Sequence, residues 1–136
     1  IAGFCGETAE DHEATCDVMR RVRFDSAFMF RYSPREGTVA HKKHEDDVPE
    51  DEKIRRLREI IDLQEAVSRE VYAGHVGSVV SALVEGPSKR DPADLYGKTD
   101  DFKTCVFPAG DAQPGDIVRA QVDSATAHTL IGHIVG

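Results

Sequence analysis

Two short segments carry residue types that could bind a ligand. Residues 3–8 (GFCGET) contain two glycines, which permit close approach of the backbone, and they precede a segment with a helical pattern. A helix N-terminus also favours an anion. Residues 31–38 (RYSPREGT) follow the next apolar stretch. Because ligands bind at the carboxyl edge of a parallel α/β sheet, the two segments together indicate a binding site at that edge, while plain turn geometry stays open as an explanation of the glycines alone.

The cysteines and histidines could bind a metal or act as nucleophiles, but their spacing is weak evidence for either role. Cys5, Cys16 and Cys105 are separated by 11 and 89 residues, which matches neither a zinc motif nor a compact iron–sulfur run. We therefore expect reduced thiols, with Cys105 in a core strand and Cys5 lacking a nearby His that would activate it as a nucleophile. His41 and His44 could coordinate a metal, but a solvated charge run is the interpretation we favour.

Basic side chains are sparse in the second half of the chain. If this half binds RNA, its cations are the candidates for phosphate contacts, and a role in solubility stays open for them. They are Lys89, Arg90, Lys98, Lys103 and Arg119.

A strand–helix–strand pattern must position the first two segments. The apolar start at 1–4 resembles the end of a buried strand, and Thr8 with Asp11 has the spacing of a capping box, so a helix should begin near Thr8. Residues 27–30 (AFMF) are apolar without alternation, which predicts a parallel strand covered on both faces. Two strands cannot cover their own faces and edges, and the chain opens without Met. We therefore expect a fragment of a longer protein, with partner strands upstream.

The period changes from helical to strand-like along the rest of the chain. Residues 33–52 are polar and predict a surface connection, and a long amphipathic helix should run from Pro49 to near Gly74. Five short strands then predict a small barrel of OB type. The expected strands are 79–84, 95–99, 104–107, 117–122 and 129–135.

Composition limits the function classes. The 136 residues carry a net charge of −8, and the halves 1–74 and 75–136 are both acidic, so a general nucleic-acid binder is excluded and any RNA contact needs a local patch. No apolar run reaches the roughly 20 residues of a membrane span, and the start does not have the pattern of a signal peptide. We expect a cytoplasmic protein.

The chain resembles the C-terminal part of the radical-SAM methylthiotransferases, specifically the MiaB-type tRNA-2-methylthioadenosine synthases. Three segments carry the resemblance: IAGFCGET at 1–8, FDSAFMFRYSPREGT at 24–38 and LVEGPSKRDPADLYGKTDDFKTCVFP at 83–108. The resemblance implies an α/β fragment in residues 1–74, the last βαβ unit of an incomplete α/β barrel plus a linking helix. It implies an all-β, OB-like TRAM barrel that binds RNA in residues 75–136.

The resemblance also implies chemistry. Such enzymes use S-adenosylmethionine (SAM) and two 4Fe-4S clusters to add a methylthio group to C2 of isopentenyladenosine next to the anticodon. By position, the SAM edge would be Ile1, Ala2, Gly3 and Phe4. The substrate-facing residues would be Tyr32, Ser33 and Arg35. The TRAM residues that grip the tRNA anticodon stem-loop would be Lys89, Arg90, Lys98 and Lys103.

Two departures and two alternatives accompany this resemblance. Cys5 stands where the family usually has Pro, and the CxxxCxxC motif is absent, so this part should hold neither a cluster nor another cofactor and should not turn over alone. The alternatives are the tail of a ribosomal-protein aspartate methylthiotransferase and a non-catalytic RNA-binding module.

Overall fold

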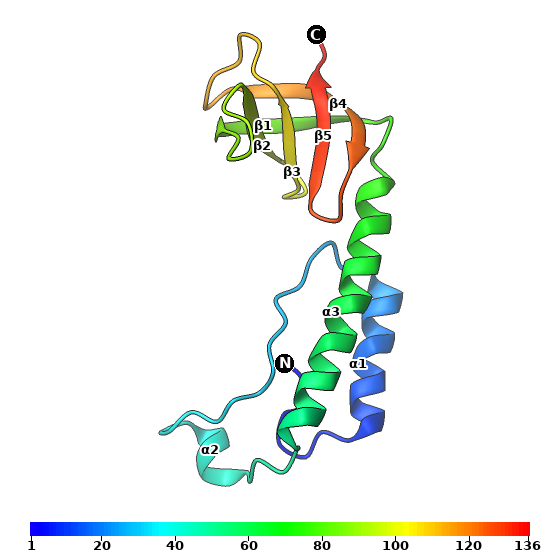
Figure 1. The fold of residues 1–136 in the computed structure, drawn as a ribbon, viewed down its shortest axis with the longest axis vertical. Coiled ribbons are helices and arrows are strands. Elements are labelled where there is room, and N and C mark those ends of the chain that lie inside the picture. The colour runs from blue at the N-terminus through cyan, green and yellow to red at the C-terminus, as the bar shows by residue number, and fades with distance from the viewer. The chain divides into compact units, whose positions relative to one another are not determined.

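The computed structural model describes residues 1–136, which divide into two units, Ile1–Val67 and Ser68–Gly136 (Figure 1). The division falls inside the long helix α3, Glu50–Ala73. None of the helices combines the length and the apolarity that crossing a lipid bilayer requires.

The helices of the first unit begin where the sequence predicts. Helix α1, Ala9–Val22, is capped by Thr8, whose side chain accepts from the Asp11 N–H while the Asp11 carboxylate accepts from the Thr8 N–H. Helix α3 follows Pro49 directly. The connection also contains a short helix, α2, Val39–Lys43, which the sequence pattern did not indicate.

The core of the first unit lies between α1 and α3, with the chain start against them. Because both helices have an apolar stripe at helical spacing, their buried faces can meet. The buried cluster comprises Ala2, Cys16, Met19 and Ile60, with Met29, Leu57 and Leu63 packed against it.

The predicted strand at 27–30 is not formed as a regular strand. The only pairing is a single parallel bridge between Ala2 and Arg31, in which the Ala2 N–H donates to the Phe30 carbonyl at 2.8 Å and the Ala2 carbonyl accepts from the Tyr32 N–H at 2.8 Å. The chain start and residues 30–32 therefore run parallel, as expected of a βαβ unit, but they pair at one residue pair only. A longer ladder would need more paired backbone than this unit supplies.

Within this chain residues 27–30 are covered on one face only, and the layer expected on the other face was predicted to come from strands upstream. Ala27 and Met29 are half-buried, but Phe28 is 94% exposed and Phe30 is 61% exposed. The alternation arises because the helices pack on one side of this segment only, and no layer of this chain covers the other side.

The second unit is a closed barrel, which confirms the predicted five strands. Neighbouring strands follow the order β1-β2-β3-β5-β4, with β4 returning to β1. All pairs are antiparallel except β3 with β5. The strands are β1 (Val79–Pro87), β2 (Asp94–Thr99), β3 (Thr104–Pro108), β4 (Ile117–Ala125) and β5 (Thr129–Ile134). Closure leaves no long edge for pairing with another chain.

The barrel core consists of inward residues that alternate along each strand. Irregularities in β1, between Val84 and Gly86, and in β4, between Val122 and Ser124, let these strands bend around the core. Tyr72, in the last turn of α3, packs into the same cluster. The other buried members are Ala82, Val84, Leu95, Cys105, Phe107, Ala120, Val122 and Leu130.

One glycine permits the closest approach of backbones in the barrel. A Cβ at Gly132 of β5 would lie 1.9 Å from the Gln121 carbonyl oxygen of β4, where no flexible side chain can yield. We expect Gly132→Ala to lower the free energy of unfolding by about 3 kcal/mol, because overpacking must displace a strand. Urea denaturation followed by circular dichroism measures this.

Gly86→Ala is the matched control, because the nearest atom to its Cβ would be a Tyr96 ring carbon at 3.8 Å, an ordinary contact. Equal stabilities of the two variants would contradict the packing described for β4 and β5.

Candidate functional site

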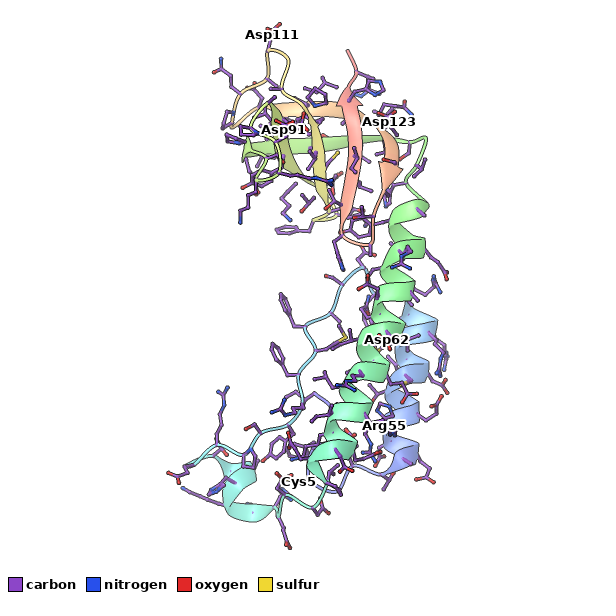
Figure 2. All side chains as sticks on the ribbon, viewed as in Figure 1. Cys5, Arg55, Asp62, Asp91, Asp111 and Asp123 are labelled. Atoms are coloured by element: carbon purple, nitrogen blue, oxygen red, sulfur yellow. The ribbon has the colours of Figure 1, made fainter.

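A groove on the barrel surface gathers the residues best suited to a polyanion. Its volume is about 860 Å³, and its walls come from the β1–β2 loop and from strands β2, β3 and β5. Asp91 marks the loop in Figure 2. We call it the barrel groove, and its lining includes Lys89, Arg90, Tyr96, Thr104, Val106 and Ile131.

Local hydrogen bonds order the loop that carries the two adjacent cations. The Ser88 N–H donates to the Asp94 carbonyl at 2.8 Å, and the buried Ser88 hydroxyl accepts from the Arg90 N–H at 3.3 Å. The Asp91 carboxylate accepts from the Ala93 N–H at 2.9 Å, as in an Asx turn. The Lys89 and Arg90 side chains remain exposed above this ordered backbone.

The period of β2 places an aromatic ring and a cation on one face of the barrel. Leu95, Gly97 and Thr99 are buried, so Tyr96 and Lys98 point outward. The Lys98 ammonium donates to the hydroxyl of Thr104 on β3 at 2.7 Å, and Thr104 also lines the barrel groove. The groove therefore combines cations, an aromatic face and apolar walls.

Two other hollows of the barrel have different charge. One of about 590 Å³ is lined by Asp111, Asp116 and His133 without a Lys or Arg. The other, of about 710 Å³, sets Arg119 beside Asp100 and Asp101. Neither offers the paired cations that a phosphate backbone requires.

Lys103 differs from the other three predicted cations and requires a correction. Its side chain is 3% exposed, its ammonium lies 2.6 Å from the Asp101 carboxylate, and it stands over the Tyr72 ring at 5.7 Å. An ammonium held in this way supports the barrel and is not on the surface. Sequence reasoning placed it beside a strand but could not see that Tyr72 and Asp101 enclose it.

The second candidate is the strand-to-helix turn, whose N–H groups the chain itself occupies. The Gly3 N–H donates to the Glu7 carboxylate at 2.9 Å, and the Gly6 N–H donates to Asp47 at 2.7 Å. Asp11 accepts from the Thr8 N–H. The anion that the sequence predicted at this helix start is therefore already present as side-chain carboxylates.

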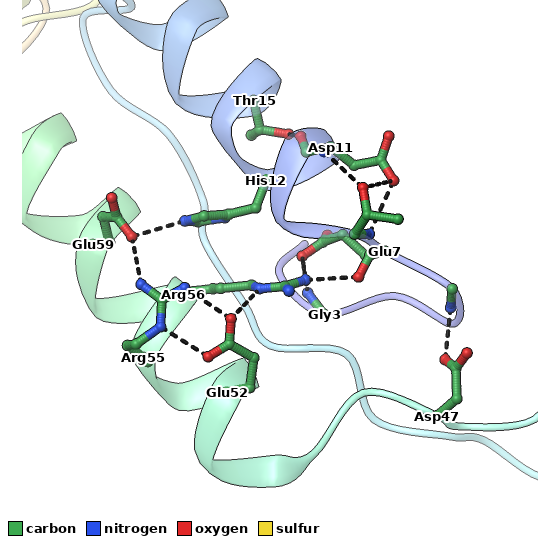
Figure 3. Close-up of polar contacts among 12 residues, drawn as sticks. Gly3, Glu7, Asp11, His12, Thr15, Asp47, Glu52, Arg55, Arg56 and Glu59 are labelled. Atoms are coloured by element: carbon green, nitrogen blue, oxygen red, sulfur yellow. Dashed lines mark hydrogen bonds and ion pairs between the residues drawn. The ribbon is translucent and has the colours of Figure 1, made fainter.

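A buried guanidinium from α3 holds the turn in place (Figure 3). Arg56 donates from Nη1 to the Glu7 carbonyl at 2.9 Å and to the Glu7 carboxylate at 2.7 Å, and from Nε to Glu52 at 2.8 Å. Glu7 in turn binds Gly3. Sequence reasoning missed Arg56 because a cation on an amphipathic helix ordinarily faces water.

A second buried cation of α3 lies against the same turn. The side chain of Lys53 is 2% exposed, and its ammonium lies 2.6 Å from Asp46 and 5.4 Å from the Tyr32 ring centre. A Cβ at Gly3 would meet the Lys53 side chain at 2.4 Å, and Gly3 has φ +73°, so only glycine fits here.

The structure brings most of the predicted SAM and substrate positions together. Phe4 and Tyr32 contact edge to face, with ring centres 4.9 Å apart. Ile1 and Phe4 are exposed, whereas Ala2 is buried. The remaining predicted residues are Gly3, which lies beneath Lys53, and Ser33 and Arg35, which are exposed beyond Tyr32.

The cysteines do not form a cluster site. Cys5 is half-buried in the turn (Figure 2), Cys16 is buried in α1, and Cys105 is buried in β3, where burial raises its thiol pKa to about 11. The three thiols therefore do not fit an iron–sulfur cluster, which needs several cysteines converging on one point. His41 and His44 are exposed on the connection and belong to no metal-capable group.

Comparisons with known proteins agree with the sequence resemblance. Residues 75–135 match the TRAM domain family, so a TRAM domain is present. The chain is 53% identical over 97% of its length to a tRNA-2-methylthio-N(6)-dimethylallyladenosine synthase of Chlorobium luteolum, and 52% identical over 97% to that of Chlorobium phaeobacteroides. A synthase of the same name from Pelodictyon phaeoclathratiforme is 49% identical over 99% of the chain.

The match covers only part of these relatives. The chain spans about 30% of the length of the first two and 31% of the third, and it corresponds to their C-terminal part. The resemblance to the MiaB-type methylthiotransferases is thus confirmed for the stretch that this chain covers.

The network around Arg56 predicts a pH-dependent stability. Hydrogen bonds from Arg55 and then Arg56 lower the pKa of Glu52 from 4.5 to about 2. Because the folded-state pKa is depressed, this stabilisation is complete above about pH 4.5 and is lost as the pH falls toward 2. The difference in urea midpoint between the wild type and Glu52→Gln should shrink over that range.

Asp51→Asn is the control, since Asp51 is exposed in the same helical turn and the ion pairs of Arg55 and Arg56 are with other carboxylates. Its urea midpoint should differ from that of the wild type by a small, constant amount. A Glu52→Gln difference that stays constant from pH 7 to pH 3 would contradict the role given to the arginines.

Proposed function

We propose that this chain is the C-terminal part of a tRNA methylthiotransferase whose complete form adds a methylthio group to C2 of isopentenyladenosine next to the anticodon. The observation that carries the proposal is about 50% identity, over nearly the whole chain, to synthases of that name. The TRAM match and the cationic groove of the barrel support it.

In this proposal, residues 75–136 bind the anticodon stem-loop through the barrel groove. Lys89, Arg90 and Lys98 contact phosphates, since they are the cations that line or flank the groove. Tyr96 offers its ring for stacking with an unpaired base, and Val106 beside it provides an apolar floor. The OB architecture favours this use, because its second and third strands and adjoining loops commonly bind oligonucleotides.

The position of the few cations matters because the negatively charged chain as a whole repels nucleic acid. With a net charge of −8, no diffuse attraction to phosphate is available. Binding must come from the few cations at the groove, so its salt dependence should be shallow and should change markedly when those cations are removed.

Residues 1–74 supply one edge of the SAM and substrate site in this proposal, as the end of an α/β barrel with a linking helix. Exposed apolar side chains at the chain start and the aromatic contact of Phe4 with Tyr32 support such an edge. The SAM edge is Ile1, Ala2, Gly3 and Phe4, and the substrate-facing residues are Tyr32, Ser33 and Arg35.

The complete enzyme uses SAM and two 4Fe-4S clusters, by its similarity to the family. The thiols of this chain do not converge, so no step of the reaction is assigned to a cluster on these residues. The role proposed for this part is to bind tRNA and to present one edge of the site to the modified base.

The test is binding of an isopentenylated anticodon stem-loop to the 136-residue chain at several salt concentrations. We expect Lys89→Ala/Arg90→Ala to weaken binding at least tenfold and to lower the slope of log affinity against log salt by about 2, since each lost phosphate contact removes about 1. Tyr96→Ala should weaken binding further than Tyr96→Phe, which keeps the ring.

Lys42→Ala/Lys43→Ala is the matched control, because it removes two adjacent exposed cations from α2. An equal loss in both double variants would mean that net charge, and not the groove, governs binding. Binding to a ribosomal-protein loop peptide but not to the stem-loop would favour the ribosomal-protein enzyme instead.

A further inference from the structure

Three metal-ligating side chains meet in the first unit, between α1 and α3. His12 and Cys16 lie one turn apart on the buried face of α1, and Glu59 faces them from α3. Their ligand atoms all lie within 4.8 Å of one another. His12 Nε2 is 3.0 Å from a Glu59 carboxylate oxygen (Figure 3) and 3.7 Å from Cys16 Sγ.

We propose that His12, Cys16 and Glu59 form a binding site for a divalent transition-metal ion of the Zn²⁺ class, with water as the fourth ligand. Neither the relatives' names nor the proposed tRNA function assigns such a site. The proposal rests on the packing of α1 against α3 alone.

The distances suit a tetrahedral ion. With Zn–N and Zn–O bonds of about 2.0 Å and Zn–S of about 2.3 Å, ligand atoms around zinc lie roughly 3.3–3.5 Å apart. The observed 3.0 and 3.7 Å differ from these values by a few tenths of an ångström. The third pair, Cys16 Sγ and the Glu59 carboxylate, lies within 4.8 Å, so the Glu59 side chain must move toward Cys16 when the ion binds. A pair at i and i+4 on one helix face is also a spacing that binds zinc in other proteins.

The donor set balances the charge of the ion. A thiolate and a carboxylate offset the two positive charges of Zn²⁺. His12 Nε2, which donates to Glu59 in the free protein, binds the ion as neutral imidazole after its proton is lost to solvent and Nδ1 takes up a proton from solvent. Burial and the Glu59 carboxylate raise the pKa of Cys16, so the free thiol carries its proton. Metal binding forms the Zn–S bond and releases that proton to solvent.

Glu59 gives an ion access to the site from solvent, and its own orientation is fixed by Arg55. The Glu59 side chain is 40% exposed, whereas that of His12 is nearly buried, so an ion can enter from the solvent side of α3. Arg55 donates to the same Glu59 carboxylate at 3.0 Å and fixes its orientation. Outer hydrogen bonds of this kind hold metal ligands in place.

Cobalt titration of the 136-residue chain under a non-thiol reductant tests the site, because Co²⁺ takes zinc geometries and absorbs visible light. We expect one Co²⁺ per chain, with a thiolate charge-transfer band and the visible bands of four-coordinate cobalt. Zn²⁺ should displace it. Cys16→Ser should abolish the charge-transfer band, and Glu59→Gln should weaken Co²⁺ binding at least tenfold.

Cys5→Ser is the matched control, because Cys5 is the more accessible thiol and lies in the turn. It should leave the titration unchanged. Glu59→Gln keeps the test valid if Cys16→Ser fails to fold, since Glu59 is partly exposed. The proposal is overturned if no charge-transfer band forms, if the band depends on Cys5, or if folded Glu59→Gln binds Co²⁺ as tightly as the wild type.

Discussion

The guanidinium of Arg56 is the group on which the geometry of the first unit depends. It is buried, so it must be hydrogen-bonded, and its acceptors are the carbonyl and carboxylate of Glu7 and the carboxylate of Glu52. Glu7 then accepts from the Gly3 N–H. Through these bonds, one helix side chain fixes the path of the turn that leads to the Thr8–Asp11 cap of α1. Charge-assisted bonds of this type are short and directional, which suits a positioning role.

The elements were predictable because their signals are local. The capping-box spacing of Thr8 and Asp11 predicts the start of α1, and Pro49 predicts the start of α3. Alternation of apolar and polar residues after Gly77 predicts the strands of the barrel. The burial of Arg56 and Lys103 was not predictable, since it depends in part on Glu7 and Tyr72, which are distant from them in sequence. A helix pattern shows which face is apolar but not which cation will be covered.

The segment at 27–30 and the barrel show opposite outcomes of the same constraint on strands. A strand needs hydrogen-bonding partners along its edges and a covering layer for its apolar face. The barrel strands supply one another with partners by closing, whereas Phe28 and Phe30 keep exposed faces because α1 and α3 cover one side only. The site residues follow this division. Tyr96 and its neighbours lie on strands of the closed barrel. Phe4 and Tyr32 lie beside a single β-bridge, and α3 packs against that segment.

A double-mutant cycle between Arg56 and Glu7 tests most directly whether this buried ion pair organises the turn. The free energy of unfolding would be measured for the wild type, Arg56→Met, Glu7→Gln and the double variant. We predict a coupling energy of about 2 kcal/mol, since the pair is largely desolvated. Additive losses, with a coupling near zero, would contradict the central place given to Arg56.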